Sequence, residues 1–117
     1  MWWLIAKILN FFCKKEIFGC YNGIARSGKW KQFKTKLILE QPYCSACNGT
    51  ENLTVHHKIP FWKDPFKELD KDNCKVICEA KTHNCHLIFG HLLLWKSWNE
   101  NVDEDCENYR QKIINRP

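Results

Sequence analysis

The sequence predicts a small α+β domain in which two short strands form a hairpin next to a helix, with further helices flanking this core. The chain has 117 residues, the size of one domain with a modest core. Two short runs have the composition of strands, 53–57 and 73–78, and an irregular loop separates them. Apolar residues recur at helical spacing in three other runs, 29–40, 85–95 and 102–114.

The first 28 residues are expected to form an N-terminal apolar helix and a linker, ahead of a domain at 29–117. Residues 2–12 are apolar except for Lys7 and Asn10, which lie on one stripe of a helix. Eleven helical residues span about 17 Å, short of the roughly 30 Å hydrocarbon core of a bilayer. We therefore expect no membrane span. The helix either packs on its own domain, docks on a partner or lies on a membrane surface.

The helix expected at 29–40 is basic and ends before Pro42, which cannot continue it. Trp30, Phe33 and Leu37 share one face, and lysines occupy the rest of the surface. The net charge of the chain is +5. A lysine-rich face binds a polyanion by neutralising phosphates, although a plain solvated face has the same composition. The lysines that would contact DNA here are Lys29, Lys31, Lys34 and Lys36.

The eight cysteines indicate a metal site rather than a secreted disulfide scaffold. No basic segment precedes the apolar N-terminal run and no cleavage site follows it, so a reducing cytoplasm is the expected location. Cys44 and Cys47 form a C-x-x-C knuckle, and Cys78 with Cys85 forms a second pair. Zinc prefers four such ligands in a tetrahedron. His83 is an alternative to Cys85 as the fourth ligand, and plain buried thiols are the alternative to a site.

Histidines cluster in the same part of the sequence. His56 and His57 are adjacent on a strand and point to opposite faces, which suits one to bind a metal and the other to take a proton. An imidazole with a pKa near 6.5 is largely neutral at pH 7. Asn73 and His86 complete the group. His91 follows His86 by five residues, a step that points it elsewhere on a regular α-helix. Metal ligation, a phosphate contact and simple packing are all open for His91.

Taken together, these motifs resemble the HNH endonucleases, and more closely a small phage-type branch of that family. The resemblance covers about residues 29–100 and departs from the family in the six residues between Cys78 and Cys85, where two are commoner. It implies a zinc-stabilised ββα-metal core, with a two-stranded hairpin plus a helix. The segments that carry it are Cys44-x-x-Cys47, Val55-His56-His57-Lys58-Ile59-Pro60, Asp72-Asn73-Cys74-Lys75-Val76-Ile77-Cys78 and Asn84-Cys85-His86.

The resemblance also implies a role for each matched residue. His56 and His86 match the ligands of a catalytic divalent ion, and some relatives use a third histidine, for which His91 is the candidate. His57 matches the general base, and Asn73 matches the residue that steadies the loop and orients the base. The catalytic ion is expected to be Mg²⁺ or Mn²⁺, with Ni²⁺ or Zn²⁺ also accepted by imidazole ligands. The residues that match the structural Zn²⁺ ligands are Cys44, Cys47, Cys78 and Cys85.

The expected activity is hydrolysis of DNA phosphodiester bonds that leaves 3′-hydroxyl and 5′-phosphate ends. Lys58 and Lys63 would help the basic helix to position the DNA backbone. The expected setting is the cytoplasm of a bacterial or phage-infected cell, where such enzymes serve phage packaging beside a terminase, homing or restriction. The alternative is a non-catalytic zinc-binding module that binds nucleic acid or a partner. That alternative explains the cysteines and lysines but not the grouping of histidines.

Overall fold

The computed structural model describes residues 20–21 and 24–117. This part of the chain is a small α+β structure, as predicted, and contains a two-stranded antiparallel hairpin with helices around it. Its elements are β1 (Cys20–Tyr21), β2 (Ile24–Ala25), α3 (Trp30–Glu40), β3 (Leu53–His57), the 3-10 turns η1 (Pro65–Lys67) and η2 (Lys71–Asn73), β4 (Cys74–Cys78), the π-helical turn η3 (His86–Gly90) and α4 (Val102–Ile114).

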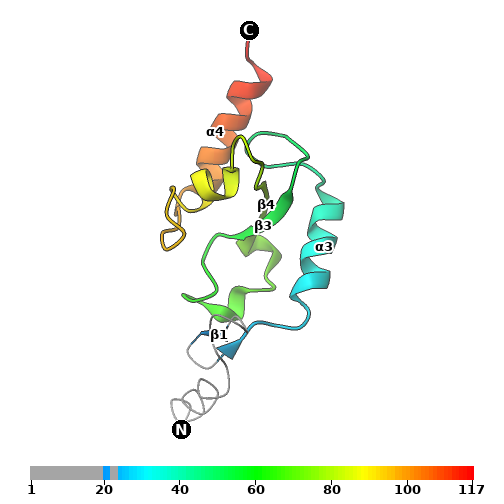
Figure 1. Ribbon diagram of the computed structural model, residues 1–117, viewed down its shortest axis with the longest axis vertical. Helices are drawn as coiled ribbons and strands as arrows, with labels where there is room; N and C mark the ends of the chain where they lie inside the picture. Colours follow the sequence, from blue (N-terminus) through cyan, green and yellow to red (C-terminus); the bar gives the residue numbers. More distant parts are fainter. Residues whose placement is uncertain (1–19, 22–23) are drawn as a thin grey trace.

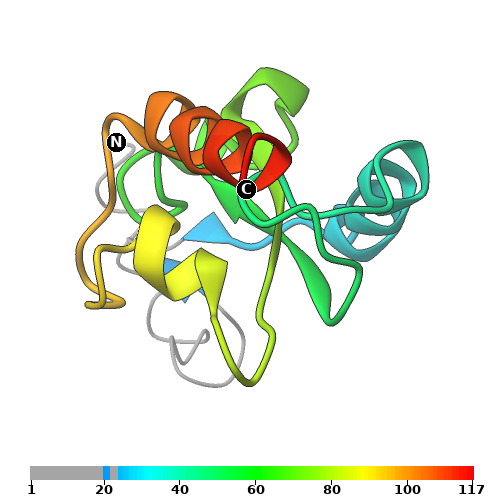
Figure 2. The same cartoon turned by 90° about the horizontal axis from the view of Figure 1, so that it is seen from above.

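The hairpin of β3 and β4 lies at the centre of the molecule. Helix α3 lies on one side of it and η3 on the other, while α4 leads from this core toward the C-terminus (Figure 1). Viewed from above, α3 and η3 again lie on opposite sides, with α4 between them (Figure 2). The strands pair in register from Leu53 opposite Cys78 to His57 opposite Cys74. The expected hairpin is therefore present, with strand limits within one residue of those predicted.

Side chains that alternate between the two faces of the hairpin contribute to two separate small cores. Val55 and Val76 face α3 and pack with Leu37, the buried residue of that helix. The fully buried Ile77 faces the other way and packs with Val102 of α4. Because side chains on a strand point alternately to the two faces, both cores share one hairpin.

The helix predicted over 85–95 is wrong in its length and type. The structure has a π-helical turn that ends at Gly90, and a tight turn follows. Leu92 and Leu93 have φ angles of 53° and 70°, in the left-handed region that a right-handed helix cannot include. Both side chains are exposed, so a longer helix would bury little apolar surface here.

The linker expected after the apolar run, within the first 28 residues, contains the short antiparallel pair β1 and β2. The helix expected within 1–28, over residues 2–12, lies outside the described residues. No helix in the described part of the chain is long and apolar enough to cross a membrane.

A buried carboxylate joins the residues just ahead of α3 to the loop between β3 and β4. Glu68 is 4 % exposed, and its Oε2 accepts a hydrogen bond from Arg26 Nε at 2.6 Å. Its Oε1 accepts a bond from the backbone N–H of Ser27 at 2.7 Å. The guanidinium of Arg26 also lies over the rings of Trp30 and Phe61, with its carbon 5.2 and 4.9 Å from their centroids. These contacts hold the start of α3 against the loop between the strands.

Glu68→Gln should lower the free energy of unfolding by about 1.5–3 kcal/mol, because a charged hydrogen bond is lost at a buried site. Urea unfolding followed by circular dichroism measures this change. The matched control is Glu40→Gln, which removes the charge from the exposed pair of Glu40 with Lys71 and should change stability little. Equal effects of the two substitutions would contradict the role given to Glu68.

Candidate functional site

Four cysteine thiols meet in the core beside the hairpin. Cys44 and Cys47 lie in the turn after α3, Cys78 ends β4, and Cys85 immediately precedes η3. Their sulfur atoms all lie within 4.8 Å of one another, and Cys47 Sγ is 3.7 Å from Cys78 Sγ. Two sulfurs of a tetrahedral zinc site with Zn–S bonds near 2.3 Å are about 3.8 Å apart. The four cysteines are therefore placed to hold a metal ion such as zinc.

Backbone N–H groups near these thiols favour negative sulfur, whereas burial opposes it. The backbone N–H groups of Ala46 and Cys47 point at Cys44 Sγ at 3.4 and 3.5 Å, and Gly49 N–H points at Cys47 Sγ at 3.4 Å. A hydrogen bond with Cys85 lowers the pKa of Cys44 to about 4. Burial and the neighbouring sulfur charge raise the pKa of Cys47 to about 11. A divalent ion at this cluster would offset the cost of burying charged sulfur, because zinc binds the deprotonated thiolate.

The structure places Cys85, not His83, in the thiol cluster. His83 is exposed in the loop between Cys78 and Cys85, and its Nδ1 lies 2.8 Å from Thr82 Oγ1. The six-residue gap forms a loop that returns to the cluster, and Cys78 Sγ donates to the carbonyl of His83 at 3.5 Å. The longer gap therefore leaves the fourth sulfur within reach.

A second cluster consists of three histidines on the other side of η3. His56 comes from β3, His86 begins η3, and His91 follows its last residue. One ring nitrogen of each lies within 4.8 Å of the others, and His86 Nε2 is 3.2 Å from His91 Nε2. The expectation that His91 points away from His86 is wrong. It assumed a regular α-helix, whereas the wider π-helical turn joins residues five apart and brings both rings to one face.

A hydrogen bond determines which nitrogen of the His91 ring is free. His91 Nδ1 lies 2.7 Å from the carbonyl oxygen of Ser97, which can only accept, so Nδ1 carries the proton. His86 Nδ1 lies 3.5 Å from a carboxylate oxygen of Glu79. Because His91 Nδ1 carries the proton, His91 Nε2 keeps its lone pair. It lies 3.2 Å from His86 Nε2, where it can accept a proton from that ring or bind a cation.

His56 is the most deeply buried member of the histidine cluster. Its ring is 1 % exposed, and neither ring nitrogen has a hydrogen-bond partner among the described residues. Burial lowers the pKa of His56 to about 3 and that of His86 to about 4, so both rings are neutral at pH 7. Neutral imidazole is the form that binds metals, and buried nitrogens without a partner are costly. The three rings fit a metal ion by their donor atoms and by the separation of those atoms.

Gly90 allows the close approach of the His56 ring. A Cβ at position 90 would lie 2.8 Å from His56 Nδ1 and 2.9 Å from its Cε1. Gly90→Ala should displace the ring, lower the free energy of unfolding by about 1–3 kcal/mol, and weaken metal binding by the three histidines. Urea unfolding and titration with nickel measure the two effects. Gly28→Ala is the matched control, because a Cβ there meets nothing within 4 Å. An unchanged Gly90→Ala protein would contradict this packing.

His57 lies on the opposite face of β3 from His56 and does not join the histidine cluster, as its position on the strand predicts. Its Nε2 lies 2.9 Å from the backbone carbonyl of Glu68, so Nε2 carries the proton and Nδ1 keeps the lone pair. Its ring stacks on Trp30 at 4.5 Å between centroids. Burial lowers the pKa of His57, which keeps the ring neutral at pH 7. The chemistry available to it is proton acceptance at Nδ1.

Asn73 closes the loop that carries Glu68. It is buried, and its side-chain oxygen accepts from the backbone N–H of Ile59 at 2.8 Å. Its side-chain N–H groups donate to the carbonyls of Ile59 at 3.1 Å and Lys67 at 3.2 Å. Asn73 thus holds both ends of the loop, next to the carbonyl that fixes the His57 ring.

One cleft brings His57 and the three clustered histidines together. Of the lysines proposed from the sequence to contact DNA, Lys34 lines this cleft. Lys58 is paired with Asp103 at 2.8 Å, and Lys63 lies over the ring of Trp98 at 5.6 Å, and both border a different pocket. The remaining three are exposed residues at the start or on the surface of α3: Lys29, Lys31 and Lys36.

Sequence reasoning missed several residues of the cleft. Arg26 lay in a segment interpreted as a linker, and Trp95 in one interpreted as a helix. Glu68, which does not line the cleft but contacts Arg26 and His57 there, lay in an irregular loop with no motif. The one available signal was the number of aromatic residues, six Trp and seven Phe, several of which line the cleft rather than a core. Comparisons with protein-family models, with curated proteins and with solved structures find no match for this chain.

Proposed function

We propose that this chain is a metal-dependent endonuclease of the HNH type that hydrolyses nucleic-acid phosphodiester bonds. One observation carries the proposal: His57, with its proton fixed on Nε2, shares a cleft with three histidines whose ring nitrogens converge. General bases and metal-ligating imidazoles are the parts that hydrolysis of an unreactive phosphodiester needs. The hairpin, the thiol cluster and η3 would form the zinc-braced ββα-metal core.

His57 is proposed as the general base. Its Nδ1 accepts a proton from the attacking water, while the Glu68 carbonyl holds the ring and stabilises the positive charge that the ring gains. Trp30 stacked on one face of the ring limits its rotation. Asn73 acts indirectly, as a positioning residue, because it fixes the loop that contains Glu68.

His56, His86 and His91 would hold the catalytic ion. A bound divalent ion would neutralise the charge that develops on the phosphoryl group. Three imidazoles without a carboxylate suit zinc, nickel or another transition metal better than magnesium, which prefers oxygen ligands. We therefore place Zn²⁺ and Ni²⁺ ahead of Mg²⁺ for this site, the reverse of the order expected from sequence.

A nicking assay tests the proposal. Purified protein that retains its structural zinc is mixed with supercoiled plasmid and, in separate reactions, with zinc, nickel, manganese or magnesium. We expect nicked plasmid with at least one transition metal and weaker or no nicking with magnesium. Absence of cleavage with every metal would sink the nuclease proposal and favour the non-catalytic zinc-binding module.

A further inference from the structure

The cleft that contains the histidines has largely aromatic walls. Its volume is about 280 Å³, close to that of a small-ligand pocket. Arg26 and Lys34 are among the described residues that line it, and no aspartate or glutamate is. The cleft therefore suits an anion that also presents a flat apolar surface. The aromatic residues that line it, apart from the histidines, are Trp30, Phe61, Trp62 and Trp95.

Trp95 is the most accessible of these aromatic residues and stands directly over the proposed metal site. Its side chain is 52 % exposed, and its ring centroid lies 5.2 Å from that of His86 and 5.0 Å from that of His91. Trp62, at 37 % exposed, also faces the cleft. An indole at the rim of a cleft and next to phosphate-binding groups is placed to stack on a base.

The turn that carries Trp95 is held in an uncommon conformation. The positive φ angles of Leu92 and Leu93 cost of order 1–3 kcal/mol each and persist only where the surroundings require them. Two further bonds hold this turn, Leu94 N–H to the His91 carbonyl at 3.1 Å and Ser97 N–H to the Leu94 carbonyl at 2.9 Å. The turn thus folds back over the histidines, and Trp95 keeps a fixed place beside them.

We propose that the cleft takes an unpaired strand of nucleic acid, with one base stacked on Trp95 while the adjoining phosphate lies at the three histidines. This inference rests on the proposed function for the phosphate position. In a duplex the faces of the bases are covered by their neighbours, so a tryptophan at the cleft rim cannot reach them. In an unpaired strand every base has an open face, and aromatic stacking is the usual way such strands are bound.

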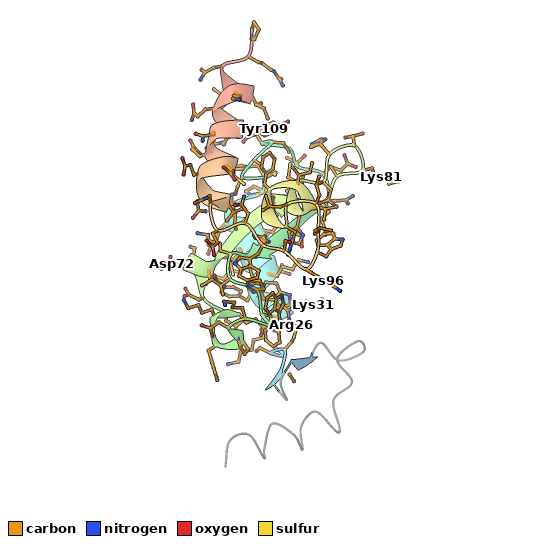
Figure 3. The ribbon with its side chains drawn as sticks, turned by 90° about the vertical axis from the view of Figure 1, so that its left-hand side faces the viewer. Arg26, Lys31, Asp72, Lys81, Lys96 and Tyr109 are labelled. Atoms are coloured by element: carbon orange, nitrogen blue, oxygen red, sulfur yellow. The ribbon has the colours of Figure 1, made fainter. Side chains whose placement is uncertain are left out.

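The charges around the cleft are consistent with a nucleic-acid strand that continues beyond the cleft. Lys34 has no ion-pair partner among the described residues. Figure 3 shows the face of the molecule that carries η3. In this view Arg26, Lys31 and Lys96 are labelled to the right of Asp72. Lysines that lie along a bound nucleic-acid strand neutralise successive phosphates and make binding depend on the salt concentration. Arg26 already pairs with Glu68, so Lys34 is the cation best placed to meet a phosphate.

Binding of labelled short oligonucleotides by the full-length, zinc-loaded His57→Ala protein tests the inference without cleavage of the probe. Fluorescence anisotropy is measured with unpaired DNA, unpaired RNA and the DNA duplex of the same sequence, at one salt concentration. We expect at least one unpaired strand to bind about tenfold or more tightly than the duplex. The arm with the tighter binding identifies the sugar.

Substitution of Trp95 in that background is the decisive step. Trp95→Ala should weaken binding of the unpaired strand about tenfold or more and leave duplex binding unchanged, and Trp95→Phe should restore most of the loss. Phe66→Ala is the matched control: Phe66 is 82 % exposed and does not line the cleft, so binding should be unchanged. Duplex binding as tight as strand binding, or no loss with Trp95→Ala in a folded protein, would overturn the proposal.

The two proposals can fail separately. Strand binding that depends on Trp95, in a protein that cuts nothing with any metal, would leave the strand-binding inference standing and remove the nuclease. Equal cleavage of duplex and unpaired substrates by wild-type and Trp95→Ala proteins would support the nuclease and overturn the strand-binding inference.

Discussion

Cys44→Ser should yield a protein without its structural metal that is largely unfolded where the wild-type protein is folded. The four sulfurs join the turn after α3, the end of β4 and the start of η3, and the core cluster around them is small. Binding of structural zinc is worth on the order of 10 kcal/mol in small domains, comparable to the entire stability of a typical fold. Metal content by atomic absorption and far-ultraviolet circular dichroism measure the two losses together.

The matched control is Cys106→Ala. Cys106 is as deeply buried as Cys44, and it lies in the same core but outside the thiol cluster. Its loss should leave a small cavity and cost of order 1 kcal/mol, while the metal content stays unchanged. A zinc chelator added to the wild-type protein should reproduce the effect of Cys44→Ser. A folded Cys44→Ser protein with no metal would show that the thiol cluster is incidental.

His57→Ala should lower the rate of plasmid nicking about 10²- to 10⁴-fold, the usual contribution of a general base. The structural metal should remain, because His57 contacts the Glu68 carbonyl and Trp30 and belongs to neither the thiol cluster nor the histidine cluster. Nicking is measured under the best metal condition for the wild-type protein, and metal content and circular dichroism are measured on the same sample.

His83→Ala is the control for loss of an imidazole as such. His83 is exposed and belongs to neither cluster, so nicking should be unchanged. Full activity of a folded His57→Ala protein would refute its assignment as the base and move that role to another group in the cleft.

The two strands of the β3–β4 hairpin and helix α3 follow from local patterns in the sequence. Leu53–His57 and the segment before Cys78 have the composition of strands. Helix α3 begins and ends within one residue of its prediction because Trp30, Phe33 and Leu37 recur on one face and Pro42 stops it. These features depend on residues that are neighbours in the sequence.

In the region after Cys85, the local pattern predicts the wrong structure. Its leucines have helical spacing, yet the chain makes one π-helical turn and then reverses through Leu92 and Leu93. The reversal lets residues later in the chain bond back to this turn: His91 Nδ1 lies 2.7 Å from the Ser97 carbonyl, and the Asn99 side chain donates to the Phe89 carbonyl. Local propensity is a weak prior, and packing of the turn outweighs it here.

By itself the sequence determined the chemical content of this protein: paired cysteines at metal-ligand spacing, a neighbouring group of histidines, and a hairpin to carry them. Only the tertiary structure decided how those groups divide. It placed Cys85 with the thiols and His91 with the other imidazoles, left Lys58 and Lys63 outside the cleft, and brought in Arg26 and Trp95. The reason is geometric, since spacing along the chain constrains residues within one element, whereas the meeting of separate elements depends on how their buried faces pack.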